Sequence, residues 1–278
     1  MHRWDGKPGS RFALGESQLA PTRRYSGSCT SPSVKMDTII RNGTIVDGTG
    51  EKAPFVGDVC LKDGLIAEVT LGPSGADGAQ EVDATGHIVT PGWVDIHTHY
   101  DGQVTWDPYC APSSNNGVTT VVFGNCGVGF APCHKQHRDF LVQLMEGVED
   151  IPGAALVEGI QWNWESWPEY LDDLETKPAA MDFGALIGHG PLKCYVMGER
   201  CYNHDEELGK EDLQHMKDVV RQAVAAGAMG FSTSRILGHR GADGNPLPGT
   251  FALERELRGI CEAVKEGGGG VSCHVCTT

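Results

Sequence analysis

The sequence predicts an α/β protein with an incomplete TIM-like (β/α) barrel and a small β-sandwich portion on its N-terminal side. Residues 36–90 contain short strands joined by tight turns, which is typical of a small β-sandwich. From residue 91 to residue 278, apolar strands alternate with amphipathic helices, which is typical of a parallel sheet. Metal-binding side chains follow several of these strands, where a β/α barrel places its active site.

Residues 1–35 are rich in Ser, Gly, Pro and Arg and show no hydrophobic period, which predicts a disordered extension. A transit peptide is the alternative interpretation because the stretch is basic, but Asp5 and Glu16 argue against it. No apolar core precedes a cleavage site, so we do not expect a secretory signal. The folded pattern begins at Met36.

Two turn signals organise the predicted β-sandwich portion. Asn42-Gly43 predicts a tight hairpin turn. Lys62-Asp63-Gly64 predicts a second turn of the same kind. These signals separate strands that we expect at residues 38–40, 44–46, 57–61, 65–69 and 81–84.

The predicted barrel has five strands, centred near residues 94, 120, 185, 230 and 272. The β-branched run at residues 117–124 indicates a strand that is buried on both faces. Helices with one apolar face are expected between the strands, at residues 137–149, 167–174, 210–226 and 253–265. A closed barrel of this type has eight strands. We therefore expect the chain to end part way round the barrel.

The composition argues against several classes of function. The formal net charge of −15 disfavours binding to nucleic acid or to an anionic membrane. No apolar run reaches the ~18 residues of a transmembrane helix. The 10 cysteines are scattered through 278 residues rather than forming a dense disulfide framework. This pattern predicts reduced thiols and a cytoplasmic protein.

His97 and His99 are the first candidate metal ligands. They follow Pro91-Gly92 and a short apolar strand, and residues two apart on a strand point to the same face. Both imidazoles can therefore meet one ion, and catalytic zinc sites keep one position open for water. Two structural histidines at a strand end are the alternative. Asp95 is predicted on the same face, where it either orients a ligand histidine or bonds the backbone.

Cys126 and His274 follow two other predicted strands. Cys126 lies between Asn125 and Gly127. A cysteine thiolate can bind zinc, so Cys126 is a candidate ligand. A buried or reactive free cysteine is the alternative. His274 offers a third imidazole. It lies within a Cys-x-x-Cys spacing, from Cys273 to Cys276, that can indicate structural zinc or a redox pair. We discount both, because the chain has no second such spacing and no thioredoxin-like context.

His189 and Ser232 are candidate substrate-binding residues. His189 lies between two glycines at a strand end, where it bonds a substrate, supports a metal ligand, or is a structural histidine at the edge of the core. Ser232 belongs to a Ser-Thr-Ser segment that we expect at the mouth of the pocket. Four other histidines are expected to be solvated: His134, His137, His204 and His215.

Together these motifs resemble the amidohydrolase superfamily and, within it, the D-aminoacylase or N-acyl-D-amino-acid deacylase family. The resemblance covers nearly everything from Met36 to Thr278. The cysteine after the second barrel strand and the Gly-Phe-Ser-Thr segment are its more specific signals. The motifs that carry it are Ile39 to Gly48, Pro91 to His99, Gly124 to Gly127, Gly188 to Gly190, Val196 to Gly198, Gly230 to Arg235, His239-Arg240 and Pro248 to Phe251.

The resemblance implies a metal-dependent hydrolase that cleaves the carbon–nitrogen bond of a small N-acyl amino acid or related amide. It implies one or two Zn²⁺ ions, with His97 and His99 at one metal position, Cys126 as the bridge and His274 at the second position. Zinc would lower the pKa of its bound water and polarise the acyl carbonyl.

Two departures from the family pattern concern the end of the chain. The resemblance also implies a proton-shuttling aspartate on an eighth strand, which has no counterpart in these 278 residues. Cys276 occupies a position where the family usually has an arginine. We therefore expect a C-terminally truncated chain with impaired activity.

Two other functions remain as alternatives. A dihydropyrimidinase or hydantoinase would open a cyclic amide, but that branch bridges its metals with a carboxylated lysine, and Cys126 argues against it. A non-catalytic protein could keep the amidohydrolase scaffold without its metal. Retention of His97, His99 and Cys126 favours descent from an active enzyme.

Overall fold

The computed structural model describes residues 35–206, 208–268 and 272–277. The chain divides into two compact units, with the division between Gly92 and Trp93. The extension predicted for residues 1–35 lies outside the described residues, apart from Lys35. No helix in the described ranges is long and apolar enough to cross a membrane.

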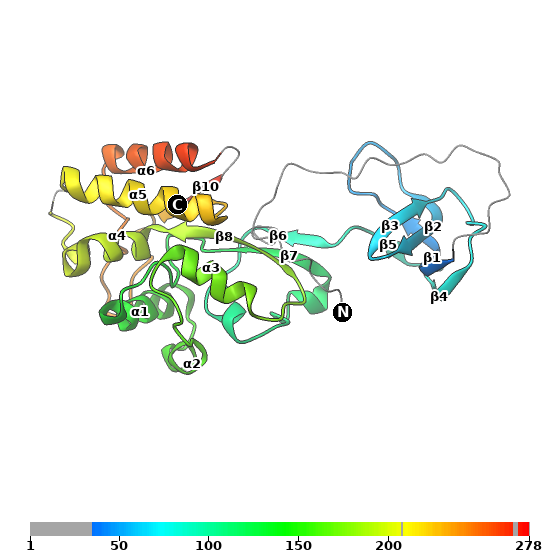
Figure 1. Ribbon diagram of the computed structural model, residues 1–278, viewed down its shortest axis with the longest axis horizontal. Coiled ribbons are helices and arrows are strands. Elements are labelled where there is room, and N and C mark those ends of the chain that lie inside the picture. Colours follow the sequence, from blue (N-terminus) through cyan, green and yellow to red (C-terminus); the bar gives the residue numbers. More distant parts are fainter. Residues whose placement is uncertain (1–34, 207, 269–271, 278) are drawn as a thin grey trace. The chain divides into compact units, whose positions relative to one another are not determined.

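The unit before Trp93 contains, in its described residues, a five-stranded mixed sheet with the order β3-β2-β1-β4, in which β5 also pairs with β1. The β1–β2 and β2–β3 pairs are antiparallel, whereas β4 and β5 run parallel to β1. Its strands are β1 (Met36–Ile45), β2 (Phe55–Lys62), β3 (Leu65–Val69), β4 (Gly78–Asp83) and β5 (Ile88–Val89) (Figure 1).

The hairpin turn predicted at Asn42-Gly43 is wrong, because both residues lie inside β1. The register with β2 shifts between Ile40 and Gly43, and Asn42 has a φ of 60°, so this is a β-bulge. Asp58 Oδ1 accepts a hydrogen bond from Asn42 N at 2.9 Å. A Cβ on Gly43 would lie 2.4 Å from a methyl group of Val89. The Asn-Gly signal therefore marks a residue with left-handed backbone and a glycine that packs closely against Val89. Strand β1 continues through both residues.

The turn predicted after Lys62 is confirmed. Asp63 and Gly64 both have positive φ values, 52° and 77°, and they join β2 to β3. Two consecutive residues with positive φ are what a two-residue hairpin turn of type I′ requires.

In its described residues, the unit from Trp93 onward contains a second five-stranded sheet, whose strand pairs are all parallel. The spatial order follows the chain order, which makes a curled half-barrel rather than a doubly wound sheet. Its strands are β6 (Trp93–Asp95), β7 (Val118–Phe123), β8 (Asp182–Gly188), β9 (Gly230–Ser234) and β10 (Ser272–Cys276) (Figure 1). The α/β fold class and the five predicted barrel strands are confirmed.

Helices connect the parallel strands, and α5 and α6 lie side by side (Figure 1). Ser166 and Glu169 form a capping box at the start of α3, and Gly227, with a φ of 119°, ends α5. The helices are α1 (Arg138–Glu149), α2 (Gly153–Gly159), α3 (Trp167–Glu175), α4 (His189–Met197), α5 (Lys210–Ala226) and α6 (Glu254–Gly267). Short 3₁₀ turns are η1 (Gln103–Thr105), η2 (Ser114–Asn116), η3 (Lys135–His137) and η4 (Gly198–Tyr202).

Helix α4 was not predicted from the sequence. It begins directly where β8 ends, and seven of its nine residues are buried. A helix that is buried on most sides shows no alternation of apolar and polar faces, so its sequence lacks the usual helical period.

The core of this unit packs apolar residues of the strands against the helices. Phe123, Ile187 and Phe231 come from β7, β8 and β9, and all three are fully buried with Met145 of α1. The prediction that residues 117–124 are buried on both faces is correct only for the second half of the run. Residues 118–120 are exposed or half-buried, whereas residues 121–123 are buried.

Candidate metal centre

Three side chains, two from segments that follow strands and one from within a strand, converge on one point of the half-barrel. His97, Cys126 and His274 each offer one ligand atom, and these atoms lie within 4.8 Å of one another. Cys126 Sγ lies 3.3 Å from His97 Nε2, and the rings of His97 and His274 are 4.9 Å apart between centroids. The segments that follow β6 and β7 and the middle of β10 thus contribute one donor each.

His99 forms a second group with Cys126 and with Glu149, the last residue of α1. The ligand atoms of these three residues also lie within 4.8 Å of one another. His99 Nε2 lies 3.2 Å from Glu149 Oε1. The other three residues that the sequence predicted as metal ligands therefore gather around Cys126.

The two histidines after β6 lie just beyond the strand rather than on it. β6 ends at Asp95, yet the rings of His97 and His99 still converge, with 5.5 Å between their centroids. Asp95 Oδ1 accepts a hydrogen bond from the backbone nitrogen of His97 at 3.1 Å. Asp95 thus holds the backbone of a candidate ligand, which favours the second of its two predicted roles.

The loop that carries Cys126 is held from the β6 side by Asn125. This buried amide donates to the carbonyl oxygens of Thr98 and Val122, at 3.2 and 3.0 Å. The loop itself uses left-handed backbone, with φ values of 79° at Gly124, 55° at Cys126 and 77° at Gly127. A cysteine in this conformation is uncommon and needs surrounding support.

Ser232 supplies that support from β9. Its side chain is fully buried; its hydroxyl accepts a hydrogen bond from Gly127 N at 3.0 Å and donates to Gly124 O. These contacts favour a role in shaping the loop around Cys126. Contact between Ser232 and a substrate stays a prediction.

His189 has both ring nitrogens engaged inside the protein. Nδ1 lies 2.8 Å from Thr233 Oγ1, and Nε2 lies 2.8 Å from Glu256 Oε1. Lys193 Nζ lies 3.2 Å from the same carboxylate oxygen, and His189 and Glu256 are 1% and 3% exposed. The network favours the structural interpretation of His189, and a contact with substrate stays a prediction.

The electrostatics of the cluster favour neutral imidazoles. Burial, followed by repulsion from His97, lowers the pKa of His99 to about 3. Burial also raises the pKa of Glu149 to about 7, so the contact between Glu149 and His99 near neutral pH is not one between two full charges. Neutral imidazole is the form that binds zinc.

The cluster fits a divalent metal ion of the zinc type. Among the described residues, His99 Nδ1 and His274 Nε2 are buried and have no hydrogen-bond partner. A buried polar atom without a partner is costly, and an ion would satisfy it. Burial, followed by the nearby Cys276 thiol, raises the pKa of Cys126 well above its usual value. A bound metal would reverse that shift, because a coordinated thiol loses its proton.

Three residues at this centre had no assigned role in the sequence analysis: Glu149, His239 and Cys276. His239 and Cys276 form a third group with Cys126, again with ligand atoms within 4.8 Å. Cys276 carried two sequence signals: the Cys-x-x-Cys spacing that we discounted, and its position two residues after His274, which repeats the spacing of His97 and His99. Glu149 has no local signal, since it is brought in by helix packing.

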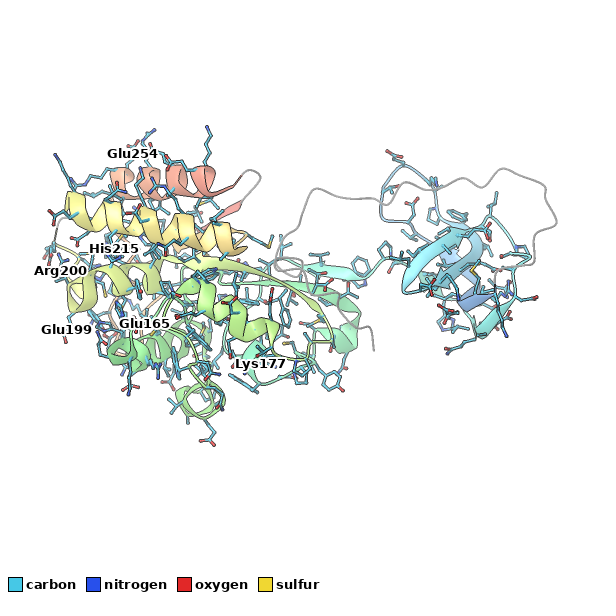
Figure 2. The ribbon with its side chains drawn as sticks, viewed as in Figure 1. Glu165, Lys177, Glu199, Arg200, His215 and Glu254 are labelled. Carbon is cyan, nitrogen blue, oxygen red and sulfur yellow. The ribbon has the colours of Figure 1, made fainter. Side chains whose placement is uncertain are left out.

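Of the four histidines predicted to be solvated, only His215 on α5 is exposed (Figure 2). His134, His137 and His204 are half-buried instead. His134 stacks on Tyr195 with 4.1 Å between ring centroids, and His204 packs edge-on against Phe251. Aromatic neighbours, which the local sequence does not reveal, account for the burial of His134 and His204.

A parallel half-barrel that gathers imidazoles and a thiol from its strands and the loops after them is the arrangement of metal-binding β/α barrels. A family model described as the amidohydrolase family matches residues 80–275. Since this match covers most of the chain, the chain belongs to the amidohydrolase family.

The similarity extends to proteins of the predicted branch. An uncharacterized protein of Mycobacterium tuberculosis is 32% identical over 85% of this chain and 39% of its own. The crystal structure of a D-aminoacylase matches with a TM-score of 0.66 and 29% identity, covering 84% of this chain and 44% of that one.

N-acyl-D-glutamate deacylase from Bordetella bronchiseptica, solved with zinc and a phosphonate mimic of the tetrahedral intermediate, matches with a TM-score of 0.63. Its identity is also 29%, covering 84% of this chain and 44% of that one. The chain thus spans about two fifths of the length of the relatives that it matches. These findings confirm the resemblance to the D-aminoacylase branch and the β/α-barrel fold.

Proposed function

We propose that this chain carries the metal centre of a zinc-dependent hydrolase that cleaves the amide bond of N-acyl-D-amino acids. The observation that carries the proposal is the convergence of His97, Cys126 and His274 from the segments after β6 and β7 and from β10. The substrate class is supported by two similar structures, a D-aminoacylase and an N-acyl-D-glutamate deacylase, the second of which was solved with zinc.

The residues divide into those that would hold the metal and those that position them. His97, Cys126 and His274 would hold one ion, and His99 would be a further ligand beside Cys126. A bound zinc ion supplies a water of lowered pKa and polarises the acyl carbonyl. Glu149 orients the ring of His99 through its contact at 3.2 Å. Asn125 and Ser232 hold the loop of Cys126.

The first test is the zinc content of the purified 278-residue chain, measured by elemental analysis. We expect near-stoichiometric zinc in the wild type and a large loss in Cys126→Ser. Cys133→Ser is the matched control, because Cys133 is also buried but belongs to none of the three ligand groups. A folded wild-type chain without zinc would contradict the proposal.

The second test separates the candidate activities. The zinc-loaded chain is assayed with N-acetyl-D-amino acids, their L enantiomers and a 5-substituted hydantoin. We expect hydrolysis of the D compounds above the L compounds, at a low rate for the impaired chain that the sequence predicts. Hydrolysis of the hydantoin alone would support the cyclic amidase instead. Stoichiometric zinc without turnover of any compound would support a non-catalytic scaffold.

A further inference from the structure

Cys276 brings a second thiol to the metal centre. Its sulfur, the Cys126 sulfur and one ring nitrogen of His239 all lie within 4.8 Å of one another. Cys126 is almost fully buried, and the other two side chains are half-buried. Cys126 is therefore common to this group and to the group of His97, Cys126 and His274.

Pairing between β9 and β10 places Cys276. Cys276 lies opposite Ser234 in the parallel register, and Arg235 N donates to Cys276 O at 2.8 Å. Alternation along β10 puts His274 and Cys276 on one face of the strand and Cys273 on the other. The strand thus presents two donors toward the centre.

The end of β9 places His239. Ser234 Oγ lies 3.0 Å from Nδ1 of His239, which fixes the orientation of the ring. The backbone nitrogen of His239 donates to Ile236 O at 3.2 Å. A ligand histidine commonly has its ring fixed by such a hydrogen bond. The side chain of Ser234 therefore orients His239, and its backbone pairs with Cys276 across the β9–β10 ladder.

Two thiolates and one imidazole form a zinc-binding set, and thiolates also favour soft ions such as Cd²⁺. We propose that Cys126, His239 and Cys276 form a second, thiolate-rich metal position that shares the Cys126 sulfur with the position at His97 and His274. Binding of a divalent ion there displaces the thiol protons to solvent. The inference rests on the proposed metal centre through Cys126, but it concerns residues that the proposed hydrolysis does not require.

Cobalt titration of the reduced, metal-free chain tests the inference. The readouts are bound Co²⁺ per chain and the near-ultraviolet absorption caused by thiolate-to-cobalt charge transfer, neither of which depends on activity. We expect two ions per wild-type chain. Cys276→Ser should bind one ion and lose roughly half of the absorption per chain, because one of its two thiolates is gone. His239→Ala should also lose one ion while it keeps both thiols.

Cys273→Ser is the matched control, since Cys273 lies on the same strand but on its other face, where its sulfur lies 3.9 Å from that of Cys261. It should behave as the wild type. If Cys276→Ser and His239→Ala both keep the wild-type ion count and absorption, the inference is wrong, while loss of cobalt in Cys126→Ser would still support the first position. If the wild-type chain binds no cobalt, both proposals fail.

Discussion

The hydroxyl of Ser232 accepts a hydrogen bond from Gly127 N at 3.0 Å, and it also donates to Gly124 O. A side chain of β9 thus joins both ends of the loop that carries Cys126. The loop needs this support, because the cysteine and its flanking glycines use left-handed backbone. The position of the shared thiol therefore depends on a residue more than 100 positions later in the chain.

Ser232→Ala should weaken both the fold and metal binding. The change leaves a buried N–H and a buried carbonyl without a partner, which costs about 1–3 kcal/mol of the free energy of unfolding. Loss of a residue that orients a ligand should lower zinc affinity by about 10- to 100-fold. Urea unfolding and competition with a zinc chelator measure the two effects.

Thr105→Val is the control for this change, because the buried Thr105 hydroxyl donates to Gly102 O at 2.8 Å within η1. It should reduce stability by about 1 kcal/mol and leave zinc affinity unchanged. Unchanged zinc affinity in Ser232→Ala would show that the loop keeps its shape without the hydroxyl.

Gly124→Ala should disrupt the approach of the cysteine loop to β8. A Cβ at this position would lie 2.0 Å from Leu186 O, and the residue has a φ of 79°. The steric clash and the left-handed backbone together should lower the free energy of unfolding, measured in urea, by about 3–5 kcal/mol.

Gly244→Ala separates those two causes. Gly244 has nearly the same φ, 81°, but a Cβ added there would meet no described atom within 4 Å. It should cost only about 1–2 kcal/mol, for the backbone conformation alone. Equal losses in the two variants would mean that the contact with Leu186 does not limit the loop.

Glu256→Ala should be among the more destabilising changes on α6. Its buried carboxylate lies 2.8 Å from His189 Nε2 and 3.2 Å from Lys193 Nζ. Truncation therefore removes a hydrogen-bonding and ionic partner from two buried polar side chains. Breaking a buried pair in this way costs about 3–5 kcal/mol in urea unfolding. Glu262→Ala removes an exposed carboxylate of α6 that pairs with Lys217 of α5, and it should cost less than about 1 kcal/mol. A small effect of Glu256→Ala would indicate that water replaces the carboxylate.

His189 should make stability depend on pH. Burial, and then the charges of Lys193 and Arg235, lower the pKa of His189 despite its contact with Glu256. In the unfolded chain the pKa is near its usual value of about 6.5, so the unfolded state binds the proton first on acidification. The stabilising contribution is therefore complete above about pH 6.5 and is lost as the pH falls toward the lower pKa of the folded state.

The test compares the free energy of unfolding of metal-free protein between pH 7 and pH 5. It should fall with pH in the wild type and fall less steeply in His189→Gln. His215→Gln is the control, since His215 is exposed on α5 (Figure 2) and should leave the slope unchanged. Equal slopes in His189→Gln and the wild type would contradict the assignment.

The sequence by itself determined the features that depend on neighbouring residues. The parallel half-barrel, the caps of α3 and α5, and the ligand candidates at the strand ends all follow from period, turn residues and the position of a polar side chain after an apolar run. These signals are local, because strand alternation and helix capping act within a few residues. The same locality made Asn42-Gly43 misleading, since Val89 and Asp58 decide between a turn and a bulge.

Only the tertiary structure decided which side chains meet. It brought Glu149 to His99 by the packing of α1, and it brought His239 and Cys276 to Cys126 by the pairing of β9 with β10. It also enclosed His189 between Thr233 and Glu256. Each of these contacts joins residues more than 40 positions apart, and its geometry depends on crossover helices and strand register. The local sequence encodes the chemistry of each donor, and the assembled fold determines its partners.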